Sequence, residues 1–146
     1  MARKQFSTFF LNGLYFGVDV LKVQEVIRFQ SLTSVPLAPH AIRGLINLRG
    51  QIVAAIDLRR RLSLPDREPS ARPPINVVVK DNEDVVSLLV DEIADVISLT
   101  DAIFEPPPET VTSSARELIL GAYKLEHRLL LELDISKTAN LAQEFR

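Results

Sequence analysis

The chain has 146 residues, of which 47% are apolar and 25% charged, and its formal net charge is −2. This composition is that of a globular domain, and the absence of cysteine excludes disulfides, thiolate catalysis and cysteine zinc sites. No apolar run approaches the roughly 20 residues of a membrane-spanning helix, and no secretory leader follows the basic start, so we expect a cytoplasmic protein.

The first predicted element is a β-hairpin. Apolar runs at Phe6–Leu11 and Leu14–Val18 are separated by Asn12-Gly13. An Asn-Gly pair between two such runs is a strong hairpin signal, because both residues tolerate the positive φ of a tight turn. The chain therefore opens with two antiparallel strands.

The next segment is less clear in its pattern. Asp19 can cap a short helix, and the spacing predicts one or two helical turns over Val20–Ile27, although a strand over Val23–Phe29 fits nearly as well. Leu32–Pro39 is predicted to be a loop because prolines oppose a central strand. His40–Gly44 is predicted to form a single helical turn that ends at its glycine.

A second hairpin forms the centre of the predicted fold. Two aliphatic runs, Leu45–Leu48 and Ile52–Leu58, flank Arg49-Gly50-Gln51, and Gly50 can adopt the positive φ that a tight turn needs. The tip of this apolar hairpin carries a cation, Arg49. The ordinary interpretation is a solvated arginine, and the functional one is an arginine presented to a partner by a rigid scaffold.

Two polar stretches follow this hairpin. Arg59–Arg61 could suggest a nucleic-acid patch, but acidic neighbours dilute it, and a short solvated helix over Leu58–Leu64 is the preferred interpretation. Residues Pro65–Pro74 contain four prolines and no large apolar side chain. We interpret them as a surface linker loop that is dispensable for folding.

The second half repeats this alternation of strands and turns. Strands are predicted at Ile75–Lys80 and Val85–Val90. The next segment, Asp91–Leu99, begins with an aspartate and repeats the segment that begins at Asp19 in the first half. Thr100–Pro108 ends in three prolines and is predicted to be extended without ladder pairing.

The last predicted elements are a capped turn, a hairpin and a weak helix. Ser113-Ser114 can cap a turn over Ala115–Leu120, and Leu118–Leu125 and Arg128–Ile135 form the hairpin. Thr138–Arg146 shows only weak helical periodicity.

An internal repeat links the two halves. Gly121–Ile135 matches Gly44–Leu58 without a gap at an offset of 121 − 44 = 77 residues, and Ile56-Asp57-Leu58 corresponds to Leu133-Asp134-Ile135. A fainter match relates the Val-Asp pairs at 18–19 and 90–91. The hairpin tips differ in sequence. The pattern therefore predicts two similar β modules whose tips have diverged.

The residues that carry chemistry are few and scattered. His40 and His127 have no metal-ligand spacing, no phosphate-binding glycine loop occurs, and no serine lies in a nucleophile motif. Asp57 and Asp134 end equivalent strands, where we expect each to act as a structural cap and not as part of a catalytic pair. We therefore predict no catalytic residue, metal or cofactor.

The order of these motifs resembles the CheW-like domain family of chemotaxis coupling proteins. The Asn-Leu-Arg-Gly hairpin at 47–50 with the downstream Ile-Asp-Leu is specific for such domains, which also occur in CheV and in the regulatory domain of the kinase CheA. The absence of receiver, ATP-binding and phosphorylatable-histidine domains favours a separate coupling protein. The resemblance extends over nearly the whole chain through Leu14–Asp19, Val20–Ile27, Val35-Pro36, Ile42–Gly50, Ile56–Arg59, Val90-Asp91, Val96-Ile97, Pro106–Pro108 and Leu129–Ile135.

This resemblance implies a mainly β fold of two intertwined five-stranded SH3-like barrels with short helices, forming one CheW-like domain over 1–146. It implies a non-enzymatic adaptor that binds the cytoplasmic tip helices of a chemoreceptor and the regulatory domain of the histidine kinase CheA, with no nucleic acid and no direct membrane insertion. An amphipathic receptor helix would lie between aliphatic walls, with an arginine and a glutamate fixing its register. The receptor-binding residues carried over are Arg49, Glu25, Gly44, Val23 and Ile27.

Two alternatives remain open from the sequence. A CheW-like adaptor could serve a non-flagellar array, such as one for surface motility. From a different class, a small nucleic-acid-binding β-barrel is suggested by Arg59–Arg61, but the acidic balance and the 6% aromatic content oppose it.

Overall fold

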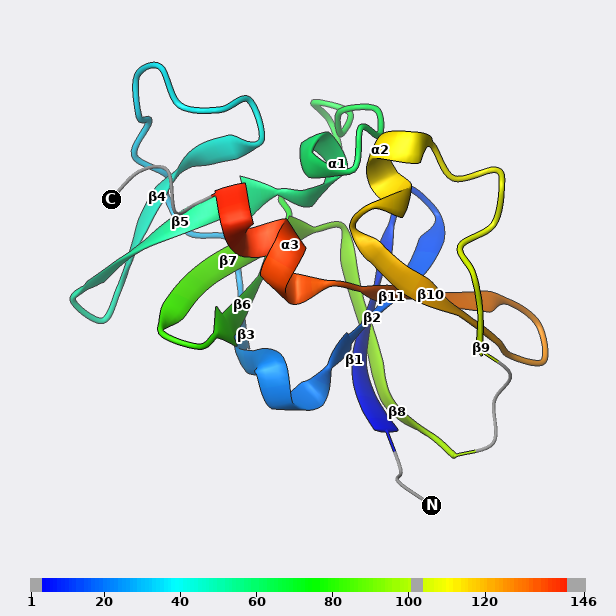
Figure 1. The fold of residues 1–146 in the computed structure, drawn as a ribbon. Helices are drawn as coiled ribbons and strands as arrows, with labels where there is room; N and C mark the ends of the chain where they lie inside the picture. Colours follow the sequence, from blue (N-terminus) through cyan, green and yellow to red (C-terminus); the bar gives the residue numbers. More distant parts are fainter. Residues whose placement is uncertain (1–3, 101–103, 142–146) are drawn as a thin grey trace.

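The computed structural model describes residues 4–100 and 104–141 and is mainly β (Figure 1). Within these residues short helical segments connect eleven strands. The elements are β1 (Lys4–Leu11), β2 (Leu14–Asp19), the 3₁₀ turn η1 (Val20–Lys22), β3 (Val23–Ile27), β4 (Ile42–Leu48), β5 (Gln51–Asp57), α1 (Leu58–Arg61), β6 (Ile75–Asp81), β7 (Asp84–Val90), β8 (Glu92–Leu99), β9 (Phe104–Glu105), α2 (Ser113–Arg116), β10 (Ile119–Lys124), β11 (Leu129–Leu133) and α3 (Ile135–Ala139).

The strands form two sheets that exchange segments. A six-stranded sheet has the order β8-β1-β2-β11-β10-β9, and a five-stranded sheet has the order β3-β6-β7-β5-β4. After β2 the chain crosses to the other sheet, where β3 pairs with β6, and after β7 it crosses back, where β8 pairs with β1. The two modules are therefore intertwined, as predicted. The two-residue β9 makes one sheet six-stranded, and among the described residues the end strands of each sheet do not pair to close a barrel.

The internal repeat has a direct structural counterpart. The β4-β5-α1 unit corresponds to β10-β11-α3, and β5 and β11 each join a neighbouring hairpin by a parallel pairing. Asp57 caps α1 by accepting a hydrogen bond from the Arg60 N–H at 3.3 Å, and Asp134 caps α3 through the Lys137 N–H at 3.0 Å. The predicted capping role of both aspartates is confirmed, and the duplication is visible in local hydrogen bonding.

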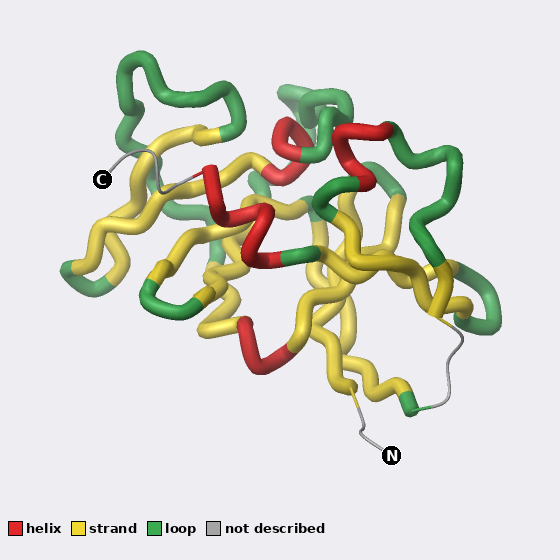
Figure 2. Tube along the Cα trace, viewed as in Figure 1, coloured by secondary structure: helices red, strands yellow, loops and turns green. Residues whose placement is uncertain are grey.

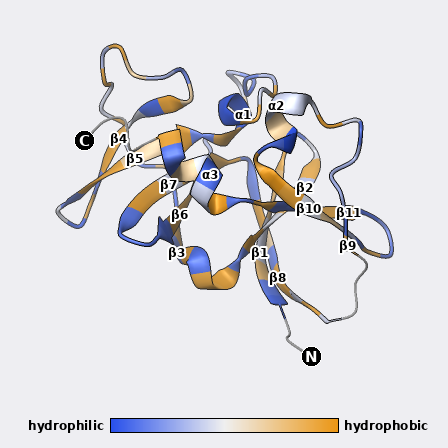
Figure 3. Cartoon of the chain, in the orientation of Figure 1, coloured by the Kyte–Doolittle hydropathy of each residue, from blue (hydrophilic) through white to orange (hydrophobic). Residues whose placement is uncertain are grey.

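Three hydrophobic clusters stabilise this arrangement. The largest lies between the sheets, where alternate residues of facing strands meet, including the fully buried Phe9, Phe16, Ile56 and Leu88. A smaller cluster occupies the other face of each sheet, one around Ile46 and Val78 and the other around Phe6 and Leu130. Apolar colour accordingly concentrates along the strands in Figure 3. Burial on both faces explains the near-continuous aliphatic runs in the sequence.

Asp91, at the end of β7, connects parts of the chain from both halves. Its carboxylate accepts hydrogen bonds from Arg59 of α1, from Arg67 of the proline-rich loop and from the Asn12 backbone N–H. Burial alone would raise the Asp91 pKa, but these hydrogen bonds hold that pKa below its ordinary value. The Arg59 side chain is only 15% exposed, so the prediction of a wholly solvated arginine helix is wrong at this residue.

The structure tests the predicted turns. Asn12 and Gly13 have the expected positive φ values of 52° and 80°, and Asp19 caps η1 through the Leu21 N–H. Residues 23–27 form strand β3, so the prediction of helical turns holds only for Val20–Lys22, and the alternative strand ends at Ile27. The β-branched residues of this segment pair with the edge of β6. This strand pairing outweighs the weak helical preference that their spacing indicated.

Four further expectations are corrected. The helical turn over His40–Gly44 is absent because the chain is extended from Ile42, which pairs with β5. Helix α2 begins at Ser113, and its cap is Thr112. Phe104–Glu105 pairs with β10, so the stretch before the prolines does form a ladder. The described C-terminal helix is α3, and residues 142–146 of the predicted weak helix lie outside the described part.

The loops run over the surface of the two sheets (Figure 2). The proline-rich loop 65–74 contains neither helix nor strand, as predicted. It is nevertheless tied to the domain, because Arg67 reaches Asp91 and Asp66 reaches Arg60.

Candidate functional site

The β4–β5 hairpin presents Arg49 at its tip. Leu48 pairs with Gln51, which leaves Arg49 and Gly50 as a two-residue turn with φ values of 53° and 86°. Positive φ at both positions matches the right-handed twist of the strands. The Asn47 side chain accepts a hydrogen bond from the Gly50 N–H at 2.8 Å. The predicted turn is confirmed, with Gln51 already part of β5.

Arg49 forms a bidentate ion pair with Glu25 of β3. Its Nη1 donates to Glu25 Oε2 at 2.7 Å and its Nη2 to Oε1 at 2.6 Å. Glu25 lies on β3 and Arg49 directly follows β4, and these are the two end strands of the five-stranded sheet. The ion pair therefore connects the two ends of the sheet, which curls so that they meet. Their hydrogen bonds lower the pKa of Glu25 and raise that of Arg49. Both groups therefore stay charged at neutral pH.

The two side chains of this pair differ in exposure. The Arg49 side chain is 72% exposed, whereas the Glu25 side chain is 18% exposed. The acid therefore fixes the direction of the guanidinium, and the remaining surface of Arg49 stays open to a partner. The structure thus brings together two of the site residues predicted from sequence.

Val23 and Ile27 are half-buried and belong to different clusters. Val23 packs against the cluster between the sheets, and Ile27 against the smaller cluster of the five-stranded sheet. The exposed large apolar side chains on this module instead include Val26, Phe29 and Ile52, at 42%, 41% and 61%. Val26 was not predicted to be an exposed residue of this surface, because the segment was interpreted with a helical period. In a strand, successive side chains point to opposite faces, so Val26 points away from Ile27.

Gly44 is buried inside β4 and positions the neighbouring loop. A β-carbon at Gly44 would lie 2.6 Å from the Thr33 carbonyl oxygen, and the φ of this residue is 157°. Thr33 and Leu45 exchange two backbone hydrogen bonds of 2.9 and 2.8 Å directly beside it. Gly44 therefore acts by letting the loop approach β4, and a side chain here would separate them.

Groups suited to catalysis or metal binding do not converge on this site. Within residues 4–100 and 104–141, no group of three or more His, Asp or Glu side chains could hold a metal ion. His40 and His127 are both exposed and lie in different turns. The described helices also include none long and apolar enough to cross a bilayer. The site contains an oriented cation, Arg49, on a module that also exposes the apolar side chains of Val26, Phe29 and Ile52.

Comparison with known proteins assigns the family. Residues 5–143 match the model of the CheW-like domain. The chain is 34% identical to chemotaxis protein CheW of Klebsiella aerogenes, over 92% of this chain and 80% of that protein. It is 35% identical to chemotaxis protein CheW of Bacillus subtilis, over 86% and 80% respectively.

A solved structure supports the same assignment. The scaffolding protein TtCheW from Thermoanaerobacter tengcongensis superposes with a TM-score of 0.79 at 29% identity, covering 91% of this chain and 85% of that one. Together with the family match over nearly the whole chain, this shows that the protein belongs to the CheW-like domain family.

Proposed function

We propose that this protein is a non-enzymatic adaptor that couples chemoreceptors to the histidine kinase CheA in bacterial chemotaxis signalling. The observation that carries the proposal is the family match over residues 5–143, with relatives named as chemotaxis proteins and a structural neighbour named as a scaffolding protein. An adaptor acts by raising the effective concentration of one partner near the other. It needs binding surfaces rather than reactive groups.

The receptor site is proposed at the Glu25–Arg49 pair. A receptor tip is a bundle of helices, and a helix of this kind offers an apolar stripe flanked by charges. The exposed Arg49 would fix its register, with Glu25 holding the guanidinium in place. Val23, Ile27 and Gly44 would support this surface from beneath, because all three are partly or fully buried.

The kinase is proposed to bind a separate surface through its own regulatory domain. Support comes from the duplication, since the hairpin tips of the two modules share a scaffold but differ in chemistry: Arg49-Gly50 in one and Glu126-His127 in the other. Two different surfaces allow receptor and kinase to be held at once. Binding to the cytoplasmic ends of receptors would place the protein in the cytoplasm at membrane arrays.

A titration tests the adaptor role. Kinase phosphorylation rate is measured against adaptor concentration at fixed receptor and kinase. The rate should rise and then fall, because excess adaptor occupies receptor and kinase separately and divides the ternary complex. A rate that reaches a plateau and stays there at large excess would contradict simple bridging. Incorporation of labelled phosphate into this chain would contradict the non-enzymatic, non-acceptor role.

A further inference from the structure

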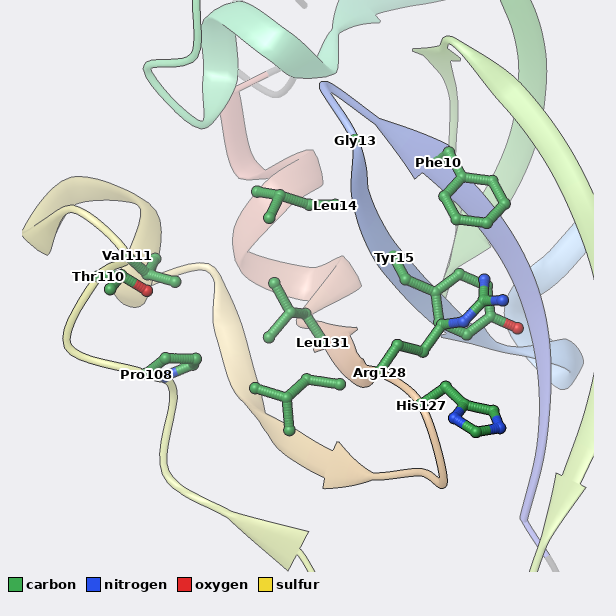
Figure 4. Close-up of a pocket in the computed structure, with 11 residues that line it drawn as sticks. Phe10, Gly13, Leu14, Tyr15, Pro108, Thr110, Val111, His127, Arg128 and Leu131 are labelled. Carbon is green, nitrogen blue, oxygen red and sulfur yellow. The ribbon is translucent and has the colours of Figure 1, made fainter.

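A cavity of about 510 Å³ opens beside the six-stranded sheet, on the module that does not carry Arg49 (Figure 4). Its apolar wall is formed by Leu14 of β2, by Leu129 and Leu131 of β11, and by Pro108 and Val111 of the segment before α2. This volume lies in the range of small-molecule sites, which are mostly apolar with a few oriented polar groups.

One side of the cavity carries an arginine stacked on aromatic rings. The guanidinium of Arg128 lies 4.8 Å from the centroid of the Tyr15 ring and 5.5 Å from that of Phe10. The two rings contact each other, with centroids 5.1 Å apart. Stacking on two rings restrains the guanidinium plane without using its N–H donors.

In the described part of the chain, Arg128 lacks the carboxylate partner that several other arginines have. Arg49, Arg59 and Arg60 each donate to a carboxylate, whereas Arg128 has no carboxylate partner within the described residues. No Asp or Glu occurs among the residues that line the 510 Å³ cavity. A cation with free donors beside an apolar wall is suited to an anion that also has an apolar body.

The neighbouring hollow gives the opposite electrostatic setting. On the other side of Arg128, a cavity of about 450 Å³ is lined by Asp95 and Glu126. These carboxylates disfavour an anion there, so the charge distribution directs an anion to the larger cavity. The adjoining His127 lines both cavities, and its Nε2 lies 3.8 Å from a Glu126 carboxylate oxygen.

We propose that the cavity bounded by Arg128, Tyr15, Leu14 and Leu131 is a binding site for a small organic anion with an aromatic or aliphatic body. The carboxylate, sulfonate or phosphate of the ligand would accept hydrogen bonds from Arg128, and its body would contact the leucines. This site is separate from the proposed receptor surface, because it uses neither Arg49 nor Glu25.

A pair of matched probes tests the proposal. The anion 8-anilinonaphthalene-1-sulfonate and its neutral parent N-phenyl-1-naphthylamine have the same aromatic body and differ by the sulfonate. Fluorescence titration of the full chain should show saturable one-to-one binding of the anion. Arg128→Gln should weaken the anion about five- to tenfold, the loss expected for one partly exposed charged contact, and leave the neutral probe unchanged.

Two further variants make the result decisive. Arg72→Gln removes an exposed charge in the 65–74 loop and should leave the binding of both probes unaffected. Leu14→Asp should weaken the binding of both probes, because it places a charge in the apolar wall of the cavity. Circular dichroism establishes that each variant is folded. The proposal is overturned if the anion shows no saturable binding, if Arg128→Gln leaves its affinity unchanged, or if Arg72→Gln weakens it equally.

Discussion

Glu25 and Arg49 are 24 residues apart in sequence and lie at opposite ends of one sheet, yet they form two parallel hydrogen bonds of 2.7 and 2.6 Å. The pair can form because the five-stranded sheet is curved, which brings its two ends close together. It holds the hairpin tip against β3 and leaves most of the arginine exposed. A partner that contacts Arg49 meets a guanidinium whose direction is already set, which lowers the conformational entropy lost on binding.

Arg49→Glu should weaken receptor binding by at least about tenfold and leave kinase binding near its original value. The substitution removes the cation and sets a second carboxylate against Glu25, so both the charge and the orientation of the tip are lost. Titration with a receptor cytoplasmic fragment and, separately, with the kinase regulatory domain measures this. Arg72→Glu, in the 65–74 loop, makes the same charge change away from the pair. If both affinities fall together while circular dichroism shows an intact fold, the two-surface model is wrong.

Shortening the proline-rich loop should be tolerated only if Arg67 is kept. Replacing residues 68–74 by a shorter Gly/Ser loop should move the thermal midpoint by less than about 3 °C, because loop length has a small effect on closure entropy. Adding Arg67→Ser should lower the midpoint by roughly 4–8 °C, since a partly buried ion pair with Asp91 is worth about 2 kcal/mol. Equal midpoints for the two variants would show that the Asp91 contact does not anchor the loop.

Glu132→Gln should stabilise the protein at neutral pH. Burial raises the pKa of Glu132 above its ordinary value of 4.5, more than the attraction of Lys4 lowers it. Folding therefore favours the protonated acid: this contribution is fully present below pH 4.5 and is lost as the pH rises through the raised pKa. Glutamine resembles the protonated form and retains its contribution at every pH.

Urea unfolding at pH 4, 5.5 and 7 measures this difference. The unfolding free energy of the glutamine variant should rise relative to that of the original protein as the pH increases. The opposite trend would mean that the Lys4–Glu132 ion pair, at 3.8 Å, outweighs the burial of the carboxylate.

Gly44→Ala should be more costly than Gly13→Ala. Both residues have positive φ, but a β-carbon at Gly13 meets nothing within 4 Å, whereas one at Gly44 meets the Thr33 carbonyl oxygen at 2.6 Å. We expect a loss of about 1 kcal/mol at Gly13 from backbone conformation, and roughly 2–4 kcal/mol at Gly44 from conformation and overpacking together. Faster hydrogen exchange of the Thr33 amide in the Gly44 variant would locate the effect, and equal losses at the two sites would exclude the steric account.

The sequence by itself determined the features that depend on neighbouring residues. The Asn12-Gly13 and Arg49-Gly50 turns follow from local φ preferences, and the Asp57 and Asp134 caps follow from a carboxylate placed before a short helix. The offset of 77 residues predicted the duplicated modules, because equal spacing of glycine, aliphatic and aspartate positions requires equal local structure. Arg49 and Glu25 were identified as site residues through the resemblance to a family.

Only the tertiary structure decided the contacts between distant segments. Val23–Ile27 became a strand because the free edge of β6 offers hydrogen bonds that an isolated helical turn lacks. Asp91 became a connecting residue because the exchange of β3 and β8 brings the Asn12 turn, α1 and the proline-rich loop together. The stacking of Arg128 on Tyr15 and Phe10 likewise depends on the pairing of β11 with β2. Such contacts depend on how sheets pair and curve, and no periodicity within one segment encodes this.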